Sequence, residues 1–295
     1  MINNTVIFNH IPKTAGLTLS DIMKKQYSIN RRFSTLEFNG KNWEGGRGEA
    51  IKYFMELPDY KRYNFDLITG HSALKLFNFV QNPIGLIMLR DPVDRVLSLY
   101  SYVRRMKWHN FHKVANQYSL YDCYKNNLHL EWNELYNGQS SSLLSTIKNI
   151  KFDSTKILYN DIVQIKYFLK EYCLVGLVER FDESLILFGE YLHWNKNLFY
   201  SKINVSNDKP AINPKTIEII KQYNEDDIYL YNYFLNNFDN LINSMDAKFK
   251  NKLKSFRSKN QLIMPLLLFK KQFNYYIRRI PQKFKSDFKI NFFTS

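Results

Sequence analysis

Short apolar runs alternate with amphipathic segments in the first part of the chain. Thr5–Ile11 is mostly apolar, whereas Leu17–Tyr27 repeats apolar residues at helical spacing. Phe65–Thr69 and Ile84–Leu89 are two more compact apolar runs. The pattern predicts a strand, a loop and a helix, followed by two further strands.

The same alternation continues downstream. A helical pattern follows the run Ile84–Leu89 as far as Tyr102. Asp161–Tyr172 again predicts a helix, and Cys173–Val178 predicts a buried strand before an amphipathic helix that opens at Asp182. Such alternation predicts an α/β protein with a parallel sheet, helices on both faces, and a ligand site at the carboxyl ends of the strands.

Other segments are less regular. Arg104–Gln139 is rich in Tyr, Trp, His and Asn with mixed spacing, so its elements are left unassigned, and we expect it to form the acceptor side of the site. Asn204–Pro214 has the composition of a loop, and Lys215–Phe238 returns to a helical pattern. We predict one main domain, residues 1–243, followed by an extension, residues 244–295.

The formal charge of +15 is concentrated in this extension. Residues 245–295 carry 13 Lys and Arg against two Asp, a net of +11, which leaves +4 for residues 1–244. A mildly basic body suits an anionic cofactor or glycan, and nucleic acid is not an expected partner.

The extension has few Pro and Gly residues, which predicts helices. It could pack on the body, lie on anionic lipid, or hold an acidic glycan. We favour packing on the body. Phe269, Phe273, Tyr276 and Ile277 stand beside basic residues, so peripheral membrane contact stays open.

The chain begins without the basic segment and long apolar stretch of a secretion signal. Its most apolar later run, Leu262–Phe269, is far shorter than the roughly 20 residues that span a bilayer. We therefore expect a cytoplasmic protein. Cys123 and Cys173 lack the spacing of a zinc site or a disulfide framework, so no metal site is predicted.

The segment Pro12–Thr18 joins the first predicted strand to the first predicted helix. Its small residues let the backbone curl around an anion, the N–H groups that open the helix point toward it, and Lys13 adds a positive charge. In a Walker loop the Lys follows the Gly, whereas here it precedes Gly16, which disfavours an ATP or GTP enzyme. Taken alone, the segment suits an ordinary turn equally well.

A second candidate phosphate contact follows the strand Ile84–Leu89. Arg90 stands at the end of that strand, where a guanidinium can chelate a phosphate, and Ser98 follows two helical turns later with a hydroxyl group. Asp91 suits the N-cap of the helix between them and Pro92 suits its first turn.

The segments His10–Gly16 and Leu89–Pro92, with Ser98, together resemble the sulfotransferase superfamily. The closest resemblance is to its family-2 branch, which includes the heparan sulfate 2-O-sulfotransferases and bacterial carbohydrate sulfotransferases. The resemblance runs from about Val6 to Phe238. Three later segments follow in the family's order: Glu179–Leu185, Asn204–Ser206 and Asp227–Tyr231.

This resemblance implies a P-loop-type fold and transfer of a sulfuryl group from PAPS (3′-phosphoadenosine-5′-phosphosulfate) to a hydroxyl group, with a carbohydrate as the expected acceptor. The first loop would bind the 5′-phosphosulfate, with Lys13 as the catalytic cation at the leaving group, and the second motif would bind the 3′-phosphate. Leu17 departs from the pattern, because relatives commonly have a hydroxyl residue there. The implied cofactor-binding residues are Lys13, Thr14, Ala15, Gly16, Leu17, Thr18, Arg90 and Ser98.

The catalytic base predicted from the sequence is His71. It follows Gly70 at the end of the predicted strand Phe65–Thr69, and its pKa suits proton transfer near neutral pH. A lone histidine is more often a packing residue. The resemblance tips the interpretation toward catalysis, since the 2-O-sulfotransferase branch uses a histidine after glycine between its two cofactor motifs.

Several other residues carry weaker signals. His10 is expected to shape a strand end, and Arg95 to form a local ion pair with Asp91 or Asp94. Glu179 and Arg180 suit either a cofactor contact or a local pair where a helix begins. The remaining candidates lie in the unassigned region: His109, His112 and His129, which could contact substrate, and Asn137–Gln139, which is also a routine turn signal.

Two other functions remain open at this point. A nucleotide-dependent kinase would need a Walker-type lysine and carboxylates for magnesium, neither of which the sequence offers convincingly. A non-catalytic protein that binds polyanions or membranes would keep the nucleotide cradle without turnover. Lys13 and His71 separate this second alternative from an enzyme.

Overall fold

The computed structural model describes residues 4–38, 41–42, 46–148, 157–201 and 212–279. Residues 204–211 of the predicted loop Asn204–Pro214, which include the motif Asn204–Ser206, lie outside these residues.

A five-stranded parallel sheet forms the centre of the molecule, with the strand order β2-β5-β1-β6-β7. Strand β1 lies between β5 and β6, with Val6 opposite both Leu67 and Ile84. The carboxyl ends of these three strands therefore meet at one edge. The strands are β1 (Thr5–Asn9), β2 (Arg32–Ser34), β5 (Leu67–Gly70), β6 (Pro83–Leu89) and β7 (Cys173–Leu177).

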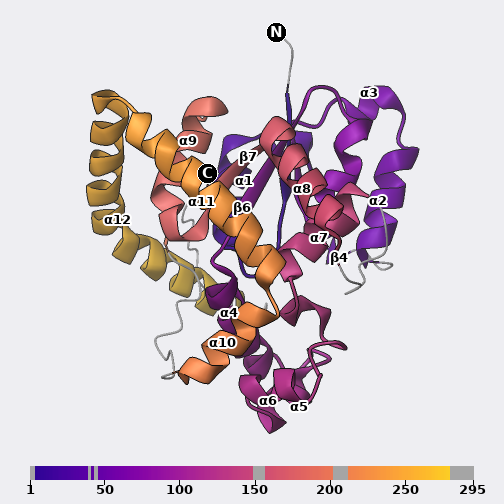
Figure 1. Ribbon diagram of the computed structural model, residues 1–295. Helices are drawn as coiled ribbons and strands as arrows, with labels where there is room; N and C mark the ends of the chain where they lie inside the picture. Colours follow the sequence, from indigo (N-terminus) through magenta and orange to yellow (C-terminus); the bar gives the residue numbers. More distant parts are fainter. Residues whose placement is uncertain (1–3, 39–40, 43–45, 149–156, 202–211, 280–295) are drawn as a thin grey trace.

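Helices flank this sheet, as Figure 1 shows, so the predicted α/β class is confirmed. Four of its five strands coincide with predicted apolar runs. The helices around the sheet are α1 (Gly16–Gln26), α2 (Gly46–Glu56), α3 (Asp59–Arg62), α4 (Pro92–Arg105), α7 (Gly138–Ile147), α8 (Tyr159–Tyr172), α9 (Phe181–Tyr191) and α11 (Glu225–Ser244). Shorter elements are η1 (Ile29–Arg31), β3 (Glu37–Phe38), β4 (Lys41–Asn42), η2 (Ala73–Phe79) and η4 (Val178–Arg180).

The sheet is buried on both faces, which is why its strands are continuous apolar runs. All five residues of β1 are buried, and Leu86–Leu89 of β6 are as inaccessible. Helix α4 begins as predicted, because Asp91 caps it by accepting a hydrogen bond of 2.9 Å from the N–H of Asp94.

The unassigned region Arg104–Gln139 packs around a second, smaller core. Its elements are α5 (His112–Gln117), α6 (Leu120–Lys125) and η3 (Asn133–Leu135), and α10 (Pro214–Gln222) packs against α6 and α4. Figure 1 shows α5, α6 and α10 gathered below the sheet. The buried residues of this core are Val96, Leu99, Val103, Ala115, Leu120, Cys123, Tyr124, Trp132, Leu135 and Ile220.

The helical pattern predicted for Lys215–Phe238 divides into α10 and α11. Asn224 separates them, fully buried, and its side chain donates to the carbonyls of Ile220 (2.9 Å) and Leu135 (3.0 Å). This asparagine ties the second core to the helices of the sheet.

The last described element is α12 (Ala247–Arg279), a helix along the edge of the molecule in Figure 1. It contains Pro265, and the helix bends along its course in the figure. Among the described residues, no helix combines the length and apolar character needed to cross a membrane.

Candidate active site

The first loop adopts a backbone that leaves an anion site open. Lys13 and Ala15 have positive φ angles of 70° and 58°, and the hydroxyl of Thr14 donates to the carbonyl of Ile11 at 2.8 Å. Ala15, the N-cap of α1, offers no side-chain acceptor. The first N–H groups of α1 therefore keep their capacity to bind an anion.

Glycine is required at position 16, because the backbone there lies very close to the ring of His10. A Cβ atom at this position would lie 1.8 Å from a ring carbon of His10, so any other residue would displace the ring. The small residue thus allows α1 to start directly beside the end of β1.

Arg90 joins the second motif to this loop. Its Nη1 donates to the carbonyl of Lys13 at 3.1 Å, so the ends of β1 and β6 converge on one place. Its Nε is buried, and among the described residues it has no hydrogen-bond partner. A buried guanidinium N–H without an acceptor fits an anionic ligand.

Lys13 lies in an electropositive setting. Its Nζ stands 4.1 Å from the centroid of the Tyr102 ring. Burial, followed by the charges of Arg105 and Arg90, lowers the pKa of Lys13 to about 8, and Glu134 acts in the opposite direction. A bound phosphate would relieve the repulsion among these cations.

His71 follows β5 in a fixed orientation. Gly70 has a φ angle of 134°, and a Cβ there would lie 2.2 Å from the hydroxyl oxygen of Thr35, so glycine is needed. The hydroxyl of Thr35 donates to the carbonyl of His71 at 2.9 Å. The ring Nδ1 of His71 lies 2.6 Å from the carbonyl oxygen of His10.

That last contact determines the tautomer of His71. A carbonyl oxygen can only accept, so Nδ1 carries the proton and Nε2 keeps its lone pair. Burial lowers the pKa of His71, so the ring is neutral near pH 7. The His10 ring stacks on it with centroids 4.6 Å apart, and burial first, then the charge of His71, lowers the pKa of His10 to about 3.

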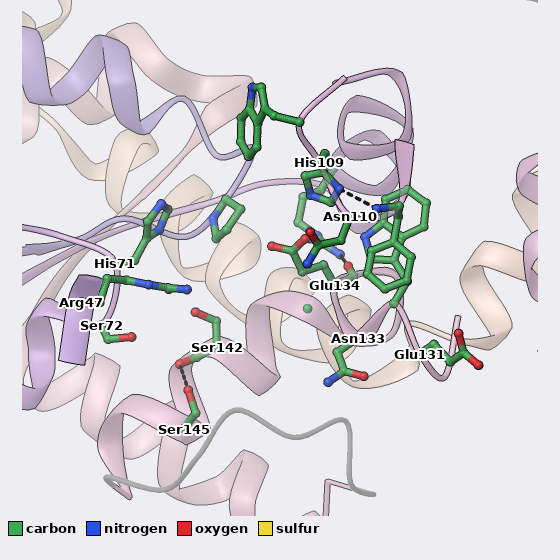
Figure 2. Close-up of a pocket in the computed structure, with 16 residues that line it drawn as sticks. Arg47, His71, Ser72, His109, Asn110, Glu131, Asn133, Glu134, Ser142 and Ser145 are labelled. Atoms are coloured by element: carbon green, nitrogen blue, oxygen red, sulfur yellow. Dashed lines mark hydrogen bonds between the residues drawn. The ribbon is translucent and has the colours of Figure 1, made fainter. Parts of the chain in front are cut away.

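A cavity of about 400 Å³ opens beside His71. Figure 2 shows His71, Arg47 and Ser72 on one side, with His109, Asn110 and Glu134 across from them. Its walls are residues of α2, α7, the ends of β1 and β5, and the second core. Aromatic and polar side chains share the lining: Trp108, Phe111, Glu131, Trp132, Asn133, Ser142 and Ser145.

A family model described as the sulfotransferase family matches residues 3–234. The chain belongs to the sulfotransferase family. The family's reaction class is sulfuryl transfer, and every segment that carried the resemblance falls inside the matched range. No curated protein matches the chain significantly.

In this sulfotransferase, the side chain of Gln139 pairs with the backbone of Arg90. Its Oε1 accepts from the Arg90 N–H at 2.9 Å, and its Nε2 donates to the Arg90 carbonyl at 2.9 Å. Asp227 holds α7 by accepting from the N–H groups of Gln139 (3.0 Å) and Ser140 (2.7 Å). Gln139 carries only a weak signal in the sequence, because Asn137 and Gly138 before it look like an ordinary turn.

Glu179 braces the same junction from the other side. Its Oε1 accepts from the Asp91 N–H at 3.1 Å, and its Oε2 accepts from the Tyr231 hydroxyl at 2.9 Å. Arg180 points elsewhere and pairs with Glu183 and Asp239. Arg180 thus forms the local ion pair that was one predicted alternative, whereas Glu179 contacts the second motif instead.

Two other residues singled out in the sequence, Arg95 and His129, are buried. Arg95 is buried and donates to the carbonyl of Glu134, and the predicted ion pair with Asp91 or Asp94 is not among the ion pairs of the described residues. Glycine at position 138 leaves room for Arg95, because a Cβ atom there would lie 2.6 Å from the Arg95 guanidinium. The ring of His129 is buried beside Tyr124 and Tyr223.

The remaining candidates are placed as follows. His109 lines the cavity, whereas Nδ1 of His112 lies 3.1 Å from the carbonyl of Val103. Thr18 is buried in α1, and Leu17 is 56% exposed. Ser98 is half-buried on α4, in the helix that follows Arg90.

Sequence reasoning missed Arg47, Glu134 and Arg105. Glu134 influences the pKa values of both Lys13 and His71, and Arg47 lowers that of His71. These residues come from segments without a motif, so only the folded chain brings them to the site.

Proposed function

We propose that this sulfotransferase transfers a sulfuryl group from PAPS to a hydroxyl group of a carbohydrate. The single observation that carries the proposal is the contact between the Arg90 guanidinium and the Lys13 carbonyl. It joins two anion-binding strand ends next to a histidine that faces a cavity.

The residues fit the donor. The orphan Nε of Arg90, the uncapped start of α1 and the mutual repulsion of Lys13, Arg90 and Arg105 all favour a multiply charged anion. PAPS supplies an activated sulfuryl group when bound. The loop with Lys13, Thr14, Ala15, Gly16, Leu17 and Thr18 would hold its 5′-phosphosulfate, and Arg90 with Ser98 its 3′-phosphate.

Two residues carry the chemistry in this proposal. His71 accepts the proton of the acceptor hydroxyl at Nε2, because its Nδ1 is committed to the His10 carbonyl. Lys13 stabilises the negative charge that develops on the leaving phosphate. The acceptor oxygen gains the bond to sulfur as the bond from sulfur to the phosphate oxygen breaks.

A carbohydrate acceptor suits the cavity lining. Trp108, which is 72% exposed, offers an aromatic face to a sugar ring. Asn110, Asn133, Ser142 and Glu134 offer hydrogen bonds to hydroxyl groups.

The test is transfer of labelled sulfuryl from PAPS to a panel of neutral and acidic glycans in the presence of EDTA. We expect labelled product, and a loss of at least about 100-fold in kcat for His71→Asn. His193→Asn is the matched control, because this exposed histidine has a φ angle of 53° that asparagine tolerates. Full activity of His71→Asn, or label transfer that needs ATP, would refute the proposal.

A further inference from the structure

The first half of α12 is fixed to the body of the protein. Phe249, Leu253 and Phe256 are buried, and the Asn260 side chain accepts from the backbone N–H of Tyr200 at 2.9 Å. Lys252 forms an ion pair of 3.0 Å with Glu190 on α9. This packing determines which face of the helix points away from the body.

The opposite face carries large apolar side chains in solvent. Leu262 is 76% exposed, Leu266 69% and Phe269 68%. Their spacing of four and three residues places them in one stripe on the helix, across from Leu253 and Phe256. Within the part of the chain that the structure describes, Leu262 and Leu266 thus give the helix a second apolar face that is largely open to solvent.

Positive charge surrounds this stripe. The stretch Ala247–Lys270 contains no Asp or Glu. Lys259 and Lys270 are exposed and lie along the flank of the stripe by helical spacing. Lys270 also lies close enough to Lys25 of α1 to contribute to the lowered pKa of Lys25, after burial.

We propose that the outward face of α12 (Lys259, Leu262, Leu266 and Lys270) docks on an anionic lipid bilayer. Leucines enter the boundary between headgroups and acyl chains, and the lysines contact lipid phosphates. An acidic glycan would use the lysines but leave the leucines in water. A second copy of the chain would bring like charges together in a symmetric contact.

The experiment is co-sedimentation of the full chain with vesicles of phosphatidylcholine alone or with 30% phosphatidylglycerol, at roughly 0.1 M and 0.5 M salt. We expect binding to the anionic vesicles at low salt. The double variant Leu262→Ser/Leu266→Ser should bind about tenfold more weakly or worse. Leu158→Ser is the matched control, since Leu158 is a 59% exposed leucine at the N-cap of α8.

Three results would overturn the proposal. They are no binding to anionic vesicles, equal binding by the double variant, and a concentration-dependent dimer in sedimentation velocity that the double variant abolishes. If the native protein and the double variant both bind heparin and neither binds vesicles, the lysines belong to a glycan site instead. PAPS turnover on a soluble acceptor should be equal in both proteins, so this test is independent of the proposed function.

Discussion

The roles proposed for Lys13 and His71 depend on neighbours that differ in kind. Burial and the charges of Arg105 and Arg90 hold the pKa of Lys13 near 8, whereas His71 is oriented by one backbone carbonyl. Each arrangement makes its residue sensitive to pH in a predictable direction.

Binding of 3′,5′-ADP, the product that the proposed reaction with PAPS would leave, should weaken above pH 8. In the free protein, Lys13 loses its charge as pH rises through about 8, and the anion must restore the proton to bind. Proton linkage requires the Kd to rise with pH, and well above pH 8 the rise should approach about tenfold per pH unit. Lys13→Arg stays charged and should flatten the profile, as isothermal titration calorimetry at pH 7 to 9.5 would show. Parallel profiles for the two proteins would contradict this account.

His10 should make the fold sensitive to acid. Its folded pKa of about 3 lies below the ordinary 6.5, so the unfolded chain binds more protons between these values and stability falls as pH falls. From pH 7 to pH 5 this amounts to about 2 kcal/mol. Between pH 7 and pH 5, the free energy of unfolding measured with denaturant should fall by about 2 kcal/mol less in His10→Phe than in the native protein. An equal loss in both proteins would show that His10 titrates normally.

At the scale of elements, α7 and η4 hold the junction of β6 and α4 in place. Gln139 satisfies both backbone groups of Arg90, and Glu179 satisfies the N–H of Asp91. The geometry of the second motif therefore depends on side chains that lie outside it.

Gln139→Ala should consequently weaken nucleotide binding without touching the nucleotide. It leaves the N–H and the carbonyl of Arg90 without their partner, at a cost to folding of about 1–3 kcal/mol for each group. We expect a lower melting temperature and a Kd for 3′,5′-ADP raised by about tenfold. Gln222→Ala, at an exposed position on α10, is the control and should change neither. An unchanged Kd for 3′,5′-ADP in Gln139→Ala would show that Gln139 does not position Arg90 for nucleotide binding.

The strands that are covered on both faces were predictable from the sequence, whereas the short strand and the short helices were not. The apolar runs of β1, β5, β6 and β7 reveal a parallel sheet because both faces are covered. Strand β2 has three residues, too few for a pattern. The region of α5 and α6 resisted assignment because short helices of six residues carry little periodicity.

The site was predictable only where it coincides with motifs. Lys13, His71 and Arg90 stand at strand ends that a parallel sheet must bring together. Glu134 and Arg47 come from outside any motif, and the pairing of Gln139 with Arg90 is a contact between residues far apart in sequence that no local pattern records.

Across the whole molecule, we infer that β1 and β6 together build one nucleotide site. Thermal unfolding with 3′,5′-ADP, compared with ATP and magnesium, measures whether that site exists. At 100 times its Kd, 3′,5′-ADP should stabilise the protein by about 2.7 kcal/mol, a rise of roughly 5–10 °C in Tm, and Arg90→Ala should lose most of it. A larger shift with ATP and magnesium, or none with 3′,5′-ADP, would contradict the account.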